Sequence, residues 1–260
     1  ACGIPGRCWS TSTVSLETID FDRLNFRSGD TVLDLGCGEG RHSISARLQA
    51  DVHVVGLDLS RRDLLTAKQR LDDFNLGGND HCNFIQGSGL ALPFANNSFD
   101  QVICSEVLEH IVDYQGVLQE IKRVLKPGGL FAVSVPRYFP EWVCWVLSSA
   151  YHEVPGGHLR IFRTSQLKTA VTNLHMGFLS RHWAHSLHVP YWWLRCAFWQ
   201  RGEQTPIVAR YHRLLVWDLM QKPWITRTLE RVLNPLLGKS VALYFRNSSD
   251  AVSYTHLRAH

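Results

Sequence analysis

One stretch of the chain decides the fold: Val32-Leu33-Asp34-Leu35-Gly36-Cys37-Gly38-Glu39-Gly40-Arg41-His42. An apolar run short enough for a buried strand leads into three glycines at alternate positions, and a helix start follows. Because glycine has no Cβ, such a turn lets a ligand approach the backbone closely, and the usual ligand is a nucleotide. The stretch therefore predicts the strand–loop–helix unit of a nucleotide-binding α/β fold.

The charges beside this loop restrict the class of ligand that it can bind. Dinucleotide folds use the spacing G-x-G-x-x-G and hold a pyrophosphate at the helix start. Here the spacing is D-x-G-x-G-x-G, with Asp34 before the first glycine and Glu39 between the last two. Two carboxylates would repel a pyrophosphate but suit an ammonium group, which favours S-adenosylmethionine (SAM) over NAD. Asp58 ends a second apolar run, 22 residues after Gly36, where an acidic residue binds ribose hydroxyls.

With these residues the chain resembles the class I SAM-dependent methyltransferases of the type 11 group, over roughly residues 20–180. The further motifs that carry the resemblance are Leu92-Pro93-Phe94 with Ser98-Phe99-Asp100, Ser105-Glu106-Val107-Leu108-Glu109-His110, and Leu125-Lys126-Pro127-Gly128-Gly129. The resemblance implies that the cofactor contacts fall on Asp34, Gly36, Cys37, Gly38, Gly40, Asp58, Leu59, Ser88, Gly89 and Ser105. One departure is Gly87-Ser88-Gly89, where such families usually have Gly-Asp-Ala. A serine hydroxyl can accept a hydrogen bond from adenine, but without charge.

Alternating patterns predict the architecture. Strands are expected at 31–35, 52–57, 82–86, 99–104 and 129–135, with helices near 40–50, 60–75 and 113–125, which indicates a parallel sheet with helices on both faces. A helix at 164–175 with Thr164 as its cap, strand six at 177–189 and strand seven at 240–245 complete the pattern. We therefore predict an α/β fold: a Rossmann-like seven-stranded sheet, mostly parallel, with an antiparallel edge hairpin and a helical aromatic cap between strands six and seven.

The expected domain boundaries follow from this pattern. A poorly defined segment covers 1–19, the SAM-binding domain 20–189, the cap 190–239, the last strand 240–247 and a tail 248–260. An insertion as long as the cap usually has a function of its own. The ending Ser253-Tyr254-Thr255-His256-Leu257-Arg258-Ala259-His260 looks like translated sequencing adapter, so the tail is taken as an artefact.

Composition is typical of a globular protein, but charge is unevenly placed. The apolar fraction is 45%, the charged fraction 19% and the net charge +4. Residues 1–136 carry 12 Lys and Arg against 17 Asp and Glu, whereas residues 137–260 carry 15 against 6 and eight of the nine tryptophans. A basic, aromatic half suits an anionic or interfacial partner, or else is a solvated surface over an aromatic core. Seven cysteines without a C-x-x-C pair favour a reducing, cytoplasmic location, with a peripheral contact at the inner face of the membrane compatible with the basic half.

Glu106, Glu109 and His110 are the candidates for chemistry. At spacings i, i+3 and i+4 they would project from one face of a helix toward the acceptor. The pattern E-x-x-E-H is similar to that of two magnesium-using families, the ubiquinone-biosynthesis O-methyltransferases and the small-RNA 2′-O-methyltransferases. That similarity implies a Mg²⁺ held by Glu106, Glu109, His110 and His158. The alternative has no metal: His110 is the general base, with Glu106 and His158 as further catalytic candidates and Glu109 pairing locally.

The aromatic cap leaves the methyl acceptor open. Trp192, Trp193 and Trp199 could stack on sugars, lie at a lipid interface or form the core of the cap. A bacterial subgroup that methylates glucose-containing lipopolysaccharides is similar in Pro136-Arg137, Tyr151-His152-Glu153, Gly156-Gly157-His158, Pro190-Tyr191-Trp192-Trp193-Leu194 and Asn234-Pro235-Leu236-Leu237-Gly238-Lys239-Ser240. This similarity implies O-methylation of a sugar or lipid-linked saccharide.

The alternatives are a quinone or phenol methyltransferase of the ubiquinone or menaquinone type, and a SAM-binding sensor or assembly subunit without turnover. The expected partner is thus a small-molecule, glycan or lipid-linked acceptor. Nucleic acid is not expected, because no stripe of Lys and Arg is present.

Overall fold

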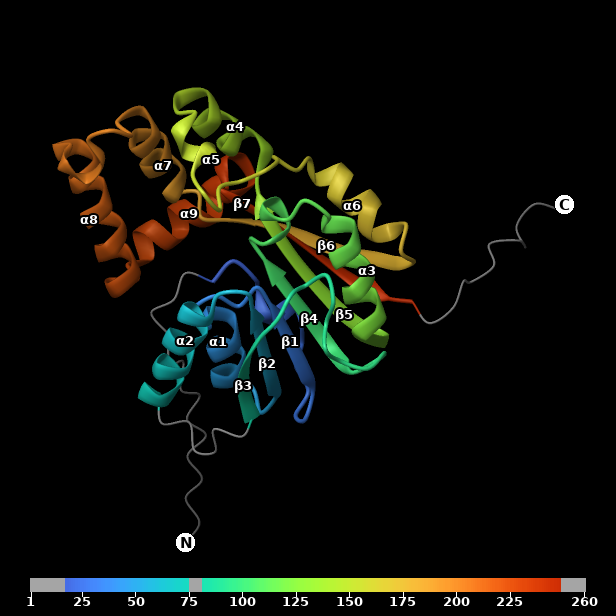
Figure 1. The fold of residues 1–260 in the computed structure, drawn as a ribbon. Helices are drawn as coiled ribbons and strands as arrows, with labels where there is room; N and C mark the ends of the chain where they lie inside the picture. The colour runs from blue at the N-terminus through green and yellow to red at the C-terminus, as the bar shows by residue number, and fades with distance from the viewer. Residues whose placement is uncertain (1–16, 75–80, 249–260) are drawn as a thin grey trace, which may run out of the picture.

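A twisted seven-stranded sheet forms the centre of the computed structural model, which describes residues 17–74 and 81–248 (Figure 1). The strands are β1 (Thr31–Leu35), β2 (His53–Asp58), β3 (Cys82–Gln86), β4 (Phe99–Ser105), β5 (Leu125–Pro136), β6 (Met176–Ala184) and β7 (Ser240–Asn247), in the order β3-β2-β1-β4-β5-β7-β6. The first five are parallel, and β7 lies antiparallel between β5 and β6. The predicted α/β fold with an antiparallel edge hairpin is confirmed.

Alternating apolar residues give the sheet two buried faces. Leu33 and Leu35 of β1 pack into one core, whereas Val32, which precedes Leu33, packs into the other. Because successive side chains of a strand point to opposite faces, a strand covered on both sides has to be apolar almost throughout. This explains the continuous apolar run that precedes the glycine loop.

Two pairs of helices cover these faces, as Figure 1 shows. Helices α3 (Tyr114–Val124) and α6 (Thr164–Thr172) contribute Leu118, Ile121 and Leu167 to one core. Helices α1 (Arg41–Gln49) and α2 (Arg61–Asp73) contribute Ile44 and Leu71 to the other. Thr164 is the first residue of α6, and the residue that precedes the helix is Arg163, which makes no side-chain cap hydrogen bond. The prediction of a Thr164 cap is therefore wrong by one position.

Strand six is shorter than the sequence indicated. Strand β6 ends at Ala184, and α7 (His188–Ala197) starts within the range predicted as strand six. Helices α8 (Pro206–Gln221) and α9 (Trp224–Leu237) follow before β7. Pro190 lies in the first turn of α7, where its missing N–H costs nothing.

Apart from α6, the helices of the C-terminal half gather at one end of the sheet. Helices α4 (Tyr138–Leu147) and α5 (Ala150–Glu153) join α7, α8 and α9 at the end toward which β4 points (Figure 1). In sheets of this kind ligands bind outside the carboxyl ends of the strands, so these helices stand beside the expected site. Within the described residues, none of the helices combines the length and apolar character needed to cross a bilayer. Most of the segment 1–19 and of the tail 248–260 lies outside the described residues.

Candidate functional site

The glycine loop between β1 and α1 has the left-handed backbone that its sequence requires. Gly36, Gly38 and Gly40 have φ angles of 70°, 51° and 80°, a region that side chains with a Cβ disfavour. A Cβ on Gly36 would collide with Val107, whereas a Cβ on Gly38 would have no described atom within 4 Å. The Gly38 backbone therefore borders open space, which fits a bound ligand.

Asp58 lies at the end of β2, against this loop. Its carboxylate accepts hydrogen bonds from the backbone N–H groups of Gly38 at 2.9 Å and Ser60 at 2.8 Å. The next residue, Leu59, leaves 68% of its surface exposed. A carboxylate beside an open apolar side chain suits ribose hydroxyls next to an adenine ring, so the arrangement fits the predicted SAM contacts of Asp58 and Leu59.

The other two carboxylates of the loop are held by protein groups. Asp34 is 1% exposed and accepts a hydrogen bond from Ser43 Oγ at 2.6 Å. Burial raises the pKa of Asp34 to about 6, although the Ser43 hydrogen bond opposes this. Glu39 forms an ion pair with Arg70 of α2. Asp34 therefore fixes α1 to β1, and Glu39 joins the loop to α2.

Cys37, Ser88, Gly89 and Ser105 lie around the same edge of the sheet. Cys37 is buried, and its thiol packs where a Cβ on Gly56 would lie. Ser88 Oγ accepts a hydrogen bond from Leu90 N at 3.2 Å, and a Cβ on Gly89 would touch Leu35. For Cys37 and Gly89, any cofactor contact has to come from the backbone.

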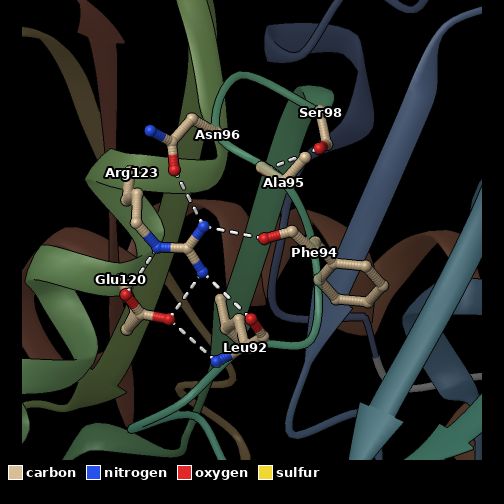
Figure 2. A network of polar contacts seen from close by, with 7 residues as sticks. All are labelled: Leu92, Phe94, Ala95, Asn96, Ser98, Glu120 and Arg123. Carbon is tan, nitrogen blue, oxygen red and sulfur yellow. Dashed lines mark hydrogen bonds and ion pairs between the residues drawn. The ribbon is translucent and has the colours of Figure 1, made fainter.

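An arginine fixes the loop that follows Ser88 and Gly89. The Arg123 guanidinium donates to the carbonyls of Leu92 and Phe94 at 3.0 and 2.7 Å and pairs with both oxygens of Glu120 (Figure 2). Glu120 in turn accepts from Leu92 N at 2.8 Å. Hydrogen bonds from Arg123 hold the pKa of Glu120 below its ordinary value. The Leu92–Phe94 segment is therefore held rigidly against α3, and the sequence did not indicate these partners.

Glu106 does not lie on a helix, contrary to the prediction. Its φ is 56°, and only Leu108–His110 form a short 3₁₀ turn. Glu106 Oε1 accepts a hydrogen bond from Ser134 Oγ at 2.8 Å, and Ser134 Oγ lies 2.8 Å from Ser105 Oγ. The left-handed backbone turns Glu106 toward β5, so Glu106, Glu109 and His110 do not share one helical face.

Glu109, His110 and His158 do come together. Each offers a ligand atom within 4.8 Å of the others, and the rings of His110 and His158 are 4.8 Å apart. Glu109 is fully buried, and neither of its carboxylate oxygens has a hydrogen-bond partner among the described residues. Burial raises the pKa of Glu109 well above its ordinary value, and the charge of Glu106 raises it further. The cluster joins the loop after β4 to the segment before α6, as the sequence predicted for His158.

The tautomer of His110 follows from its hydrogen bond. His110 Nδ1 lies 3.3 Å from the carbonyl of Gly157; because a carbonyl only accepts, Nδ1 carries the proton and Nε2 is the basic nitrogen. Burial lowers the pKa of His110, and His158 lowers it further. His110 is thus neutral near pH 7 and able to take a proton.

Glu141 of α4 is a residue of this site that the sequence analysis missed. It is 2% exposed and accepts hydrogen bonds from His158 Nδ1 at 2.5 Å, Trp145 Nε1 at 3.1 Å and Tyr151 OH at 3.2 Å. Burial would raise the pKa of Glu141, but the hydrogen bond and charge of His158 outweigh it and lower the pKa. The sequence signal that could have indicated Glu141 is that it is the one acidic residue in the aromatic stretch Tyr138–Leu147. Arg160 was also missed; it donates to Val112 O at 2.9 Å and Leu108 O at 3.2 Å and so holds the loop that carries His110.

Comparison with known proteins agrees with this geometry. The profile described as a methyltransferase domain matches residues 26–183, which is more than half of the chain. The chain belongs to the methyltransferase-domain family. The match covers the glycine loop, Asp58 and the Glu109–His110–His158 cluster.

Individual relatives are similar over part of their length. The demethylmenaquinone methyltransferase of Oceanobacillus iheyensis is 39% identical over 109 residues, 41% of this chain and 44% of that protein. The sterol 24-C-methyltransferase of Pneumocystis carinii is 35% identical over 135 residues, 52% of this chain and 33% of that protein. The chain thus spans less than half the length of these relatives. The Haemonchus contortus phosphoethanolamine N-methyltransferase 2, solved with S-adenosyl-L-methionine, shares the fold with a TM-score of 0.57 at 18% identity, covering 88% of this chain and 51% of that one.

These findings confirm the predicted class I, SAM-dependent methyltransferase family and its SAM cofactor. The relatives act, by their names, on a quinone and on sterols, which are small molecules. The sugar and lipopolysaccharide subgroup stays a prediction, as do the individual contact residues and the domain boundaries.

Proposed function

We propose that this methyltransferase transfers the methyl group of SAM to a hydroxyl of an amphiphilic acceptor, a sugar or lipid-linked saccharide, with His110 as general base. The observation that carries this is the neutral His110, whose Nδ1 is held by Gly157 O and whose Nε2 is the basic nitrogen. A group that accepts a proton near pH 7 has to be neutral and within reach of the acceptor, and His110 meets the first condition by its pKa.

When bound, SAM supplies a methyl group on a positively charged sulfur, which is already activated for transfer. The glycine loop and Asp58 orient this group in line with the acceptor. His110 Nε2 takes the proton from the acceptor hydroxyl as the oxygen forms its bond to the methyl carbon, and the bond from carbon to sulfur breaks with its electrons left on sulfur. Glu141 positions His158, which packs edge-on against His110.

The predicted magnesium does not fit the cluster. Glu106 is engaged with Ser134, so Glu109, His110 and His158 would be the ligands, with two imidazole nitrogens and one carboxylate. Mg²⁺ prefers oxygen ligands in octahedral geometry, whereas imidazoles suit transition metals. Mg²⁺ therefore has no part in the proposed transfer. Treatment with EDTA should leave the rate unchanged, and loss of activity that Mg²⁺ restores would contradict this.

The exposed surface of the cap helix α9 is one reason to propose an amphiphilic acceptor. Five large apolar residues recur at helical spacing along α9 and are exposed: Trp224, Ile225, Leu229, Val232 and Leu236. Arg227 and Arg231 lie on the same helix. An exposed apolar stripe with flanking cations suits the interface of an anionic membrane, from which a lipid-linked acceptor would be taken. We propose that α9 makes this peripheral contact.

Vesicle binding tests the contact. Trp224 and Leu236 are 75% and 72% exposed, so the change of both to Ser should weaken binding to phosphatidylglycerol vesicles at least about tenfold, since burial of each large apolar side chain contributes about 1.5–3 kcal/mol. Leu65→Ser is the matched control, because Leu65 is 61% exposed on α2. Equal binding of all three proteins would contradict the proposal.

A second candidate is methylation of a quinone or phenol. The similarity to a demethylmenaquinone methyltransferase favours it, and an isoprenoid tail would use the same apolar stripe. A turnover screen with labelled SAM over lipid-linked saccharides and demethylmenaquinone separates the two. SAM binding without transfer to any acceptor would favour the third interpretation, a sensor or assembly subunit.

A further inference from the structure

A second cluster of ligand atoms lies at the base of the cap, apart from His110. His185 follows β6, His188 is the first residue of α7 and Glu230 belongs to α9. Each offers one nitrogen or carboxylate oxygen, and these atoms lie within 4.8 Å of one another. Three segments that are distant in sequence thus converge on one point.

Two atoms of this cluster have no partner among the described residues. His188 Nδ1 and Glu230 Oε1 are buried, and neither has a hydrogen-bond partner among the described residues. Leaving a buried polar atom unpaired costs about 1–3 kcal/mol. His188 Nδ1 and Glu230 Oε1 face the same region without forming an ion pair with each other. This indicates that a bound ligand between the two atoms contacts both.

His185 is held in the orientation that a metal ligand needs. It is 8% exposed, and its Nε2 lies 3.2 Å from Thr18 Oγ1. With Nε2–H donating to Thr18, Nδ1 keeps its lone pair for an ion, as metal-bound histidines usually do through a second partner. The His185 and His188 rings are 5.6 Å apart and nearly perpendicular.

The charges favour neutral imidazoles beside an acid. Burial lowers the pKa of His188 to about 4 and that of His185 well below its ordinary value, so both are in the neutral form that binds metals. Burial, together with the nearby charge of Asp218, raises the pKa of Glu230 to about 7. The charges of Lys239 and Arg41 reach His185, and Lys239 also reaches His188, where the carboxylate of Asp218 opposes it.

We propose that His185, His188 and Glu230 form a binding site for a divalent transition metal, with Zn²⁺ as its expected occupant. Two imidazoles and one carboxylate are a known zinc donor set, with bond lengths of about 2.0–2.2 Å that a small closure of the side chains would reach. The ion joins α9 to the β6–α7 junction. Hydrogen bonds already join the same elements, from Ser186 N to Asn234 Oδ1 at 2.9 Å. The site therefore fixes the cap relative to the sheet.

The test is zinc binding to the full chain stripped of metal, measured by competition with a chromophoric chelator in the absence of SAM and acceptor. The wild type should bind one Zn²⁺ at this cluster and gain thermal stability. Glu230→Gln, which keeps the volume but removes the charge, and His188→Gln should each weaken that binding at least about tenfold and lose the gain in Tm. The Tm of each variant without metal shows whether it folds.

A control separates this site from the first cluster. His110→Ala removes a ligand of the Glu109–His110–His158 cluster and should leave this zinc affinity unchanged. With Co²⁺ in place of zinc, the visible spectrum should show nitrogen and oxygen ligation without a sulfur charge-transfer band, which excludes the cysteines. Wild-type zinc affinity in both Glu230→Gln and His188→Gln, or its loss only in His110→Ala, would overturn the proposal. Because no turnover is measured, failure here is distinct from failure of the proposed methyl transfer.

Discussion

Gly38→Ala tests the claim that the loop backbone borders the cofactor. Gly38 has φ 51°, and an added Cβ would meet no described atom within 4 Å. The substitution should therefore cost only the left-handed backbone strain of alanine, about 1–2 kcal/mol. A methyl group inside the cofactor space should weaken SAM binding by about 1–3 kcal/mol, roughly 5- to 150-fold.

Gly128→Ala is the matched control. Gly128 has φ 79°, and its added Cβ also meets no described atom within 4 Å, but it lies at the opposite end of β5 from the glycine loop. Both variants should lose similar stability in urea unfolding, while isothermal titration with SAM should show weaker binding for Gly38→Ala alone. If the two variants bind SAM equally well, Gly38 does not border the cofactor and the reasoning is refuted.

Three further predictions follow from the pKa values and hydrogen bonds. His110→Ala should lower kcat by about 10²–10⁴-fold with little change in SAM affinity. Because the pKa of His110 is lowered, the wild-type rate should be flat near pH 7 and fall only under acid conditions. A rate that still rises above pH 7 would argue against His110 as the base. Asp34 has a pKa of about 6 in the folded protein, so it binds its proton more tightly there than in the unfolded chain. The free energy of unfolding should therefore fall as the pH rises from about 4 to 6. At pH 7 the ionised Asp34 should lower it by about 3 kcal/mol. Asp34→Asn should remove that pH-dependent cost in urea unfolding, and an unchanged pH profile would contradict it. Arg123→Lys should lower the free energy of unfolding by about 2 kcal/mol, because lysine cannot reproduce the hydrogen bonds to Leu92, Phe94 and Glu120. Arg70→Lys, at the exposed ion pair with Glu39, should lower it by less than about 1 kcal/mol. Equal losses in the two variants would contradict the stabilising role of the Arg123 hydrogen bonds.

The sheet could be predicted because its signal is local. Strands covered on both faces are short apolar runs, and the glycine loop can only follow such a strand, so the first five strands were located within a few residues. Strand six was predicted too long, because the apolar residues between Ala184 and Pro190 suit a strand or a helix equally well. Tertiary packing against α4 and α8 resolves that choice in favour of α7.

The sequence indicated which acidic and histidine residues belong to the site, but it did not indicate how these residues are arranged in space. The sequence pattern E-x-x-E-H indicated the acidic and histidine residues, but the left-handed turn at Glu106 cannot be read from spacing. Glu141 acts through contacts with residues that are 4, 10 and 17 positions away in the chain, so no single motif contains it. His185, His188 and Glu230 come together only when the cap folds back on β6.

The position of the transferred methyl group shows whether the acceptor atom is a hydroxyl oxygen. The full chain is incubated with methyl-labelled SAM and lipid-linked saccharide or demethylmenaquinone acceptors, and the labelled product is analysed by NMR. We expect a new methyl ether on an acceptor hydroxyl, with its formation strongly reduced in His110→Ala. Label on a ring carbon of the quinone, or transfer that is unaffected by His110→Ala, would contradict it.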